Sequence, residues 1–141
     1  MAKLTKMTGM KTVLGNLHKA EAKLIRGIGQ GLKVGGLHLQ SASQAIVPVD
    51  LGPLKASAFT RSIGTAKSPE VIVGYTANYA VFVHEDLTKS HGQAFNVKHR
   101  DEIAAGNTPN RNDNQQAKFL EKPSREERKA ILEIIYRYAK L

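Results

Sequence analysis

Residues 12–46 read TVLGNLHKAEAKLIRGIGQGLKVGGLHLQSASQAI, and this run predicts one long amphipathic helix. With successive residues 100° apart and Lys19 set at zero, seven apolar side chains fall between about 140° and 240°. They are Leu14, Leu17, Leu24, Ile25, Ile28, Leu32 and Leu39. Four cations fall within about 40° of zero: Lys19, Lys23, Arg26 and Lys33. The predicted helix therefore carries an apolar face and a basic face on opposite sides.

Glycines are concentrated in the second part of this run, at Gly27, Gly29, Gly31, Gly35 and Gly36. Each costs roughly 1 kcal/mol relative to alanine in a helix interior. The helix therefore needs packing partners, from the same chain or from a neighbouring subunit, and the last two glycines mark a place where it could break. The spacing is not that of a nucleotide-binding loop, since no strand precedes it and no Gly-Lys-Ser/Thr follows. Close packing against a neighbour explains the glycines better.

The segments that follow predict a turn and a small sheet. Pro48 ends the long helix, because proline disfavours helical backbone in the residue before it. Residues 49–53 form a turn in which Asp50 suits the cap of a short helical turn. Residues 55–63 and 70–75, the latter rich in β-branched side chains, predict two strands paired as an antiparallel hairpin.

Three further segments complete the predicted architecture. Residues 79–85 fit either a strand or a short helix, and residues 88–115 form a polar loop that is long for a compact domain. A capping box over 124–127 predicts a last helix over about 125–140. Its apolar face consists of Ile131, Ile134, Ile135 and Tyr138. The chain is therefore predicted to be a single α+β domain over 1–141, with a long N-terminal helix, a small antiparallel sheet, a short middle helix, a long polar loop and a C-terminal helix.

Charge and composition narrow the classes of function. The net charge is +9, and residues 1–44 carry seven lysines and arginines against Glu21 alone, a net of +6. This imbalance favours an anionic partner, which could be nucleic acid, an acidic protein face or an anionic membrane, although a basic face can also serve solubility alone. The absence of cysteine excludes a disulfide scaffold, a cysteine nucleophile and cysteine-based zinc sites. No apolar run is long enough for a membrane span, and no signal peptide is expected.

Catalytic and metal-binding patterns are weak. The candidate ligands are His84, Glu85, Asp86, His91 and His99, and no two histidines have the i, i+4 spacing of a helical zinc site. Two adjacent acids offer little to Mg²⁺, and the chain contains no G-x-S-x-G elbow for a nucleophilic serine. We therefore expect no catalytic residue, no metal and no cofactor. A small hydrolase or nuclease that uses His84, Glu85 and Asp86 is the remaining enzymatic alternative.

Three segments in a fixed order carry a family resemblance. They are IVPVDLGPLKAS (46–57), VGY followed by NYAVFVHE (73–75 and 78–85), and AKFLEKP (117–123), which leads into the last helix. In this order, after a long amphipathic helix, they resemble the tail-completion or head–tail joining family of tailed double-stranded DNA phages. The likeness covers roughly residues 10–138 apart from the loop. The chain departs from the family pattern at Leu51, where threonine is usual, and after the Tyr-Ala segment, where Glu-x-Gly-Thr is common.

The resemblance implies a non-enzymatic virion protein, assembled in the host bacterial cytoplasm and located in the phage neck. It implies a homo-oligomeric ring, commonly of six, that contacts the portal-side connector or stopper and the tail terminator or tube. Genomic double-stranded DNA passes through such a ring, and no membrane is involved. The matching positions, expected to serve the turn, the core or an interface, are Pro48, Asp50, Gly52, Leu54, Ser57, Gly74, Tyr75, Tyr79, Ala80, Phe119 and Leu120. Tyr75, Tyr79, Phe82 and Phe119 are expected to supply aromatic area to the core.

The basic face of the long helix supports an alternative function. Lys19, Lys23, Arg26 and Lys33 suit contact with phosphates, so a sequence-independent nucleic-acid-binding protein is the second hypothesis. No base-reading motif accompanies the four cations, and no sequence specificity is expected. A solvated face, or one that meets acids on a ring neighbour, explains them equally well.

Overall fold

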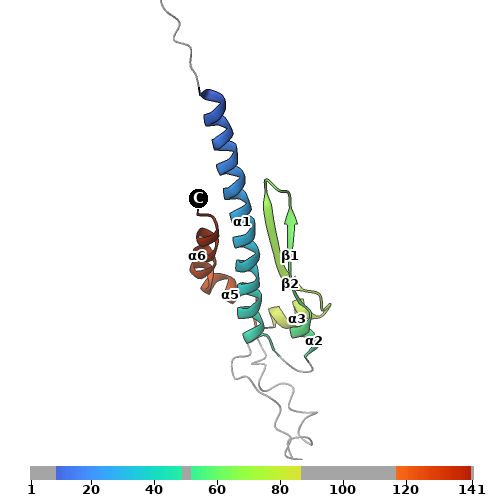
Figure 1. Ribbon diagram of the computed structural model, residues 1–141. Helices are drawn as coiled ribbons and strands as arrows, with labels where there is room; N and C mark the ends of the chain where they lie inside the picture. Colours follow the sequence, from blue (N-terminus) through green and yellow to red (C-terminus); the bar gives the residue numbers. More distant parts are fainter. Residues whose placement is uncertain (1–8, 49–51, 87–116, 141) are drawn as a thin grey trace, which may run out of the picture.

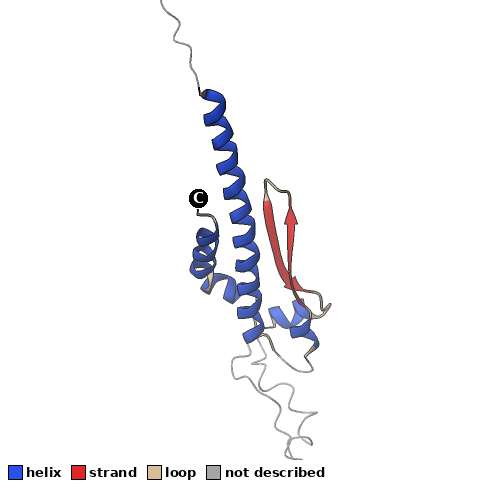
Figure 2. Ribbon diagram, in the orientation of Figure 1, coloured by secondary structure: helices blue, strands red, loops and turns tan. Residues whose placement is uncertain are grey.

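The computed structural model describes residues 9–48, 52–86 and 117–140. The long helix α1 (Met10–Ile46) forms the axis of the molecule (Figure 1). The other elements are α2 (Pro53–Ala56), β1 (Ala58–Gly64), β2 (Pro69–Tyr75), α3 (Ala80–Glu85), α5 (Glu121–Glu126) and α6 (Arg128–Tyr138). The β1–β2 hairpin lies along one flank of α1 and helices α5 and α6 lie along another (Figure 2). The predicted α+β class is therefore confirmed.

The α1 helix confirms the predicted long helix and begins two residues before the expected start. The break considered possible at Gly35-Gly36 does not occur, because α1 continues through this pair without interruption. Both glycines are buried under neighbouring elements, and that packing offsets their cost to the helix. The interpretation that the glycines serve close packing holds, and the partners lie within the chain.

Glycines spaced four residues apart form the surface of α1 that receives α6. A Cβ atom on Gly27 would collide with the carbonyl oxygen of Tyr138, and one on Gly31 would lie 2.8 Å from the Cα atom of Ile135. Positions i, i+4 and i+8 share one helix face, so Gly27, Gly31 and Gly35 bring the two backbones together. The apolar face predicted for the last helix meets this surface through Ile135 and Tyr138.

The hairpin packs on a different flank of α1. A Cβ atom on Gly36 would lie 2.7 Å from Cγ1 of Val71 and 2.9 Å from Cγ2 of Thr60, so this glycine also marks a close approach. The strands pair antiparallel with Ala58 opposite Tyr75, which confirms the predicted hairpin. The first strand starts later than the expected residue 55, because residues 53–56 form the helical turn α2.

The C-terminal helix differs from the prediction at its start. Residues 121–126 already form α5, in which the Ser124 hydroxyl donates to the carbonyl oxygen of Glu121 at 2.6 Å. The predicted capping box is therefore absent, and α6 begins at Arg128 with no side-chain cap at Glu127. Proline lacks an N–H but is tolerated in the first turn of a helix, so Pro123 fits inside α5.

The structure decides between the strand and the helix predicted for residues 79–85. Several other predictions concern residues outside the described ranges. Residues 80–85 are helical, so the helix reading of this segment is correct. The hydrophobic core cluster among the described residues consists of Val47, Leu54, Ala80 and Phe119, all near the C-terminal end of α1. Asp50, His91, His99 and the 88–115 loop lie outside the described residues.

Candidate functional site

The three segments that carry the family resemblance meet in one place. We call Val47, Leu54, Ala80 and Phe119 the motif cluster, since the first two come from the first segment and the others from the second and third. Val47 and Phe119 are each only 1% exposed. The Phe119 ring packs edge-on against the rings of Tyr75 and His84, with centroids 5.0 Å apart in both pairs. Segments far apart in sequence thus share one core, and Leu120 packs against it.

A partly buried hydrogen bond connects α1 to this cluster. The hydroxyls of Ser43 and Tyr75 lie 2.7 Å apart, and Ser43 is completely buried. Burial raises the pKa of Tyr75, and the bond to Ser43 opposes that rise. The phenol therefore stays neutral at physiological pH and serves as a structural partner rather than as a base.

The small residues of the motif have local backbone roles. Gly52 adopts a left-handed φ of 84° where α2 begins, a conformation that favours glycine. The Ser57 hydroxyl donates to the carbonyl oxygen of Leu54 at 2.7 Å and so closes α2. A Cβ atom on Gly74 would lie 3.2 Å from the Phe59 ring, which fills that space. These contacts support a structural role for the motif.

His84 and Glu85, two of the candidate catalytic residues, connect α3 to the segment before α5. Glu85 accepts from His84 Nδ1 at 2.9 Å and forms an ion pair with Lys118. Hydrogen bonding to Lys118 lowers the pKa of Glu85, and the same bond raises the pKa of Lys118. The Lys118 backbone N–H also donates to the carbonyl oxygen of His84 at 2.8 Å. Glu85 is thus a charged structural partner, and no group of three metal-ligating side chains occurs in the described ranges.

The predicted basic face lies on the outside of α1. Lys19, Lys23, Arg26 and Lys33 are all exposed. None of the four forms an ion pair with an acid in the part of the chain that the structure describes. Fourteen residue steps at 1.5 Å each make this face about 21 Å long. It is available to an anionic partner along its whole length.

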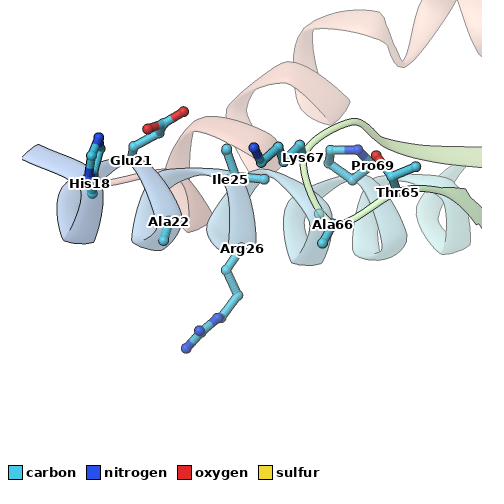
Figure 3. Close-up of a pocket in the computed structure, with 10 residues that line it drawn as sticks. His18, Glu21, Ala22, Ile25, Arg26, Thr65, Ala66, Lys67 and Pro69 are labelled. Atoms are coloured by element: carbon cyan, nitrogen blue, oxygen red, sulfur yellow. The ribbon is translucent and has the colours of Figure 1, made fainter.

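A cleft of about 700 Å³ separates the hairpin turn from α1. Figure 3 shows His18, Glu21 and Ile25 from α1, Lys67 from the hairpin turn and Pro69 from the start of β2 along its walls. Charges of both signs line it, from Glu21, Arg26 and Lys67. Neither a convergent polar set nor a metal cluster marks it as a ligand site among the described residues.

Several large apolar side chains among the described residues are largely exposed. Tyr79 and Phe82 were expected in the core, but Tyr79 is 41% exposed and Phe82 is 78% exposed. Tyr79 is the N-cap residue of α3, and Phe82 lies within this helix of fewer than two turns, of which Ala80 and Val83 reach the core. Val13 and Leu17 near the start of α1 are 65% and 61% exposed. Sequence periodicity identified the apolar face of α1 but did not reveal where its cover ends.

Comparisons with protein-family models, with curated proteins and with solved structures find no significant match. The family resemblance therefore stays a prediction from the residues quoted above. Within the described ranges, no helix combines the length and the apolar character that a membrane crossing requires.

Proposed function

We propose that the protein is a non-enzymatic structural subunit of a tailed phage's neck, where copies form a ring that joins the DNA-filled head to the tail. The observation that carries the proposal is the motif cluster. The segments 46–57, 73–85 and 117–123 lie apart in the sequence, yet each supplies residues to one small core. Motifs that define a fold are expected to meet in one core, because packing in the core holds the segments in their arrangement.

The distribution of apolar surface also supports an assembly role. The described residues bury few large side chains, while side chains such as Val13, Val81 and Phe82 remain more than 60% exposed. Exposed apolar area of this kind is typical of surfaces that meet other proteins. A ring subunit would cover it with neighbouring copies, with the portal-side connector or stopper, or with the tail terminator or tube.

A genetic test addresses the proposal directly. A nonsense mutation in this gene, placed in a phage that encodes it, should yield heads and tails that do not join. Supplying the wild-type protein should restore joined particles, which electron microscopy would count. Normal joined virions from the mutant, or purified virions that lack the protein, would overturn the proposal.

The second candidate is a sequence-independent nucleic-acid-binding protein. The observation that favours it is the exposed basic face of α1, whose four cations lack acidic partners among the described residues. Each phosphate contact contributes about 0.9 to the slope of log affinity against log salt on duplex DNA. Changing Lys19, Lys23, Arg26 and Lys33 to glutamine should then reduce that slope by about 3 to 4.

A control with the same change in charge separates this face from general basicity. It replaces Arg128, Lys129, Arg137 and Lys140, which are exposed on or next to α6, with glutamine. Equal losses of DNA affinity in the two variants would reject a specific role for the α1 face. A wild-type protein with no DNA affinity at ~50 mM salt would reject the second candidate. The ring proposal tolerates that result, because DNA that must pass through a channel should not be held tightly.

A further inference from the structure

The β1–β2 hairpin is a sheet of only two strands within the described ranges, so each strand has one edge without a partner strand there. At the turn, the backbones of Thr65 and Ser68 exchange two hydrogen bonds, of 3.0 and 3.2 Å. Antiparallel pairing alternates such pairs with pairs whose N–H and C=O groups point away from the partner strand. The register then gives the residues whose backbone groups point outward. They are Ala58, Thr60 and Ser62 on β1 and Val71, Val73 and Tyr75 on β2.

These two edges have little protection against pairing with a further strand. The Ala58 carbonyl oxygen accepts from Gln40 Nε2 at 3.4 Å, while the outward backbone groups of the other five residues form no hydrogen bond in the described part of the chain. Proteins commonly protect such edges with lysine or proline. Neither strand contains lysine, and the single proline, Pro69, stands at the very start of β2. Both edges are therefore suited to accept a strand.

The face of the hairpin that is turned away from α1 carries charges without partners. Val71 and Val73 lie against Gly36 of α1, and residues of the opposite parity point to the other side. That outer face consists of Phe59, Arg61 and Ile63 on β1 and Glu70 and Ile72 on β2. Arg61 and Glu70 are both exposed, and neither forms an ion pair within residues 9–48, 52–86 and 117–140. Each strand thus presents one unpaired charge, and the two charges are opposite.

The outer face matches one register between the β2 edge of one copy and the β1 edge of another. A register two residues out of step with the hairpin itself places Glu70 directly opposite the neighbour's Arg61. The same register places Ile72 opposite the neighbour's Phe59. The outward backbone groups of the two edges still face each other, because a shift of two residues preserves the alternation. One contact therefore combines backbone hydrogen bonds with an ion pair and an apolar pair.

Contacts between two like edges lack this match. The strand β1 carries a cation and no acid, and β2 carries an acid and no lysine or arginine. Two β1 edges or two β2 edges therefore bring no opposite charges together. A copy added through unlike edges is displaced by two strands, or about 10 Å, which is also the distance between the axes of packed helices. The α1 helices of the two copies then have room to lie side by side.

We propose that the β2 edge of one copy pairs with the β1 edge of the next copy, so that successive hairpins form one continuous sheet. This inference rests on the proposed ring and names the contact that builds it. Because two different edges meet, the contact is heterologous, and repeated copies close into a ring when the rotation between neighbours permits. Backbone hydrogen bonds hold the strands together, and the ion pair between Glu70 and Arg61 sets the register.

Charge reversal in the full-length protein tests the register. Arg61→Glu leaves only acids on the outer face, Glu70→Arg leaves only cations, and each should weaken self-association in sedimentation velocity by about 10-fold. Combining the two substitutions in one chain, or mixing the two single variants, pairs opposite charges again and should restore association. Controls with the same changes in net charge are Arg128→Glu and Glu133→Arg, at exposed positions of α6, and they should associate like the wild type. Equal weakening by the controls, or no recovery in the combined variant, would overturn the inference.

A proline at an outward position tests the backbone pairing itself. Ser62→Pro removes an N–H that points out of β1 and leaves the hydrogen bonds of the hairpin intact, so it should abolish association. The matched control Ser62→Ala keeps this N–H and should associate like the wild type, and thermal unfolding checks that every variant remains folded. Association that survives Ser62→Pro, or a wild-type protein that stays monomeric up to about 1 mM, would show that the edges do not join copies of this chain. The genetic test above decides the neck proposal independently.

Discussion

The two halves of α1 belong to one unbroken helix but differ in what surrounds them. The inner half, residues 27–46, has α6 on one flank and the hairpin on another, and its end lies beside the motif cluster. The outer half, residues 10–26, carries the same apolar periodicity and leaves Val13 and Leu17 more than 60% exposed. Periodicity therefore identifies the apolar face, and the four buried glycines, Gly27, Gly31, Gly35 and Gly36, identify where other elements of the same chain cover the helix.

The largest predicted effect is a difference in stability between two phenylalanine substitutions, one at the buried Phe119 and one at the exposed Phe82. Replacing Phe119, which is 1% exposed, by alanine should lower the free energy of unfolding by about 3–5 kcal/mol, since it leaves a cavity between three segments. Replacing Phe82, which is 78% exposed, should change it by no more than about 0.5 kcal/mol. Denaturant unfolding measures both. Similar losses at the two positions would contradict the division into covered and uncovered regions.

Two glycine substitutions should have opposite signs in the two halves. Gly27→Ala places a Cβ against the carbonyl oxygen of Tyr138 and should destabilise by about 1–3 kcal/mol, because the α6 backbone must move away. Gly15→Ala meets open space and should add about 1 kcal/mol of helix propensity. Far-UV circular dichroism and denaturant unfolding should show less stability for the first and more helix for the second. The same sign at both positions would refute the assigned α6 packing.

The hydrogen bond between Ser43 and Tyr75, near the end of the inner half, should show a strong energetic coupling between the two residues. Tyr75→Phe leaves the buried Ser43 hydroxyl without its partner at 2.7 Å and should cost about 1–3 kcal/mol. Adding Ser43→Ala should recover part of this loss, because no unpaired hydroxyl then remains buried. A double-mutant cycle measures the coupling, and simple additivity of the two changes would show that the bond contributes nothing.

Tyr75 should also make the inner half sensitive to alkali. The folded state raises the pKa of Tyr75, so its contribution is full below the ordinary value of 10.0 and is lost as pH rises through the folded value. Tyr75→Phe should therefore remove part of the alkaline loss of stability, which thermal unfolding from pH 8 to 11 would detect. An identical alkaline limb in the wild type and the variant would exclude Tyr75 as its source.

The smallest effect concerns the link between α3 and the segment before α5. Lys118 lowers the pKa of Glu85, so this contribution is present above the ordinary value of 4.5 and is lost as pH falls through the folded value. The pair is exposed to water, which keeps its effect on global stability small. Lys118→Met should raise the Glu85 pKa toward its ordinary value in an NMR titration. No change on substitution would show that His84 alone sets it.

The sequence predicts the elements better than their boundaries. The apolar period of α1 and the β-branched run Val71-Ile72-Val73 are local signals, and both elements form where expected. The capping box at Ser124 failed because the helix starts earlier, at Glu121, where no local cap marks it. The exposure of Phe82 was missed for a related reason: a short helix buries one face, and tertiary packing decides which.

The sequence identifies the motif residues and the local backbone roles of some of them, but it does not predict which of them meet in the core. Pro48, Gly52 and Ser57 have local backbone reasons, and turn chemistry predicts those. The convergence of Val47, Leu54 and Phe119 depends on contacts across much of the chain, which no local pattern encodes. The basic face was predicted correctly as a face, although its partner stays a hypothesis.

Hydrogen exchange along α1 tests most directly whether its outer half depends on a partner. In the dilute monomer, amides of residues 10–26 should exchange far faster than those of residues 27–46, and they should become protected when the protein associates. Equal protection of both halves in the monomer would contradict the account, because the outer half would then be stable without a neighbour.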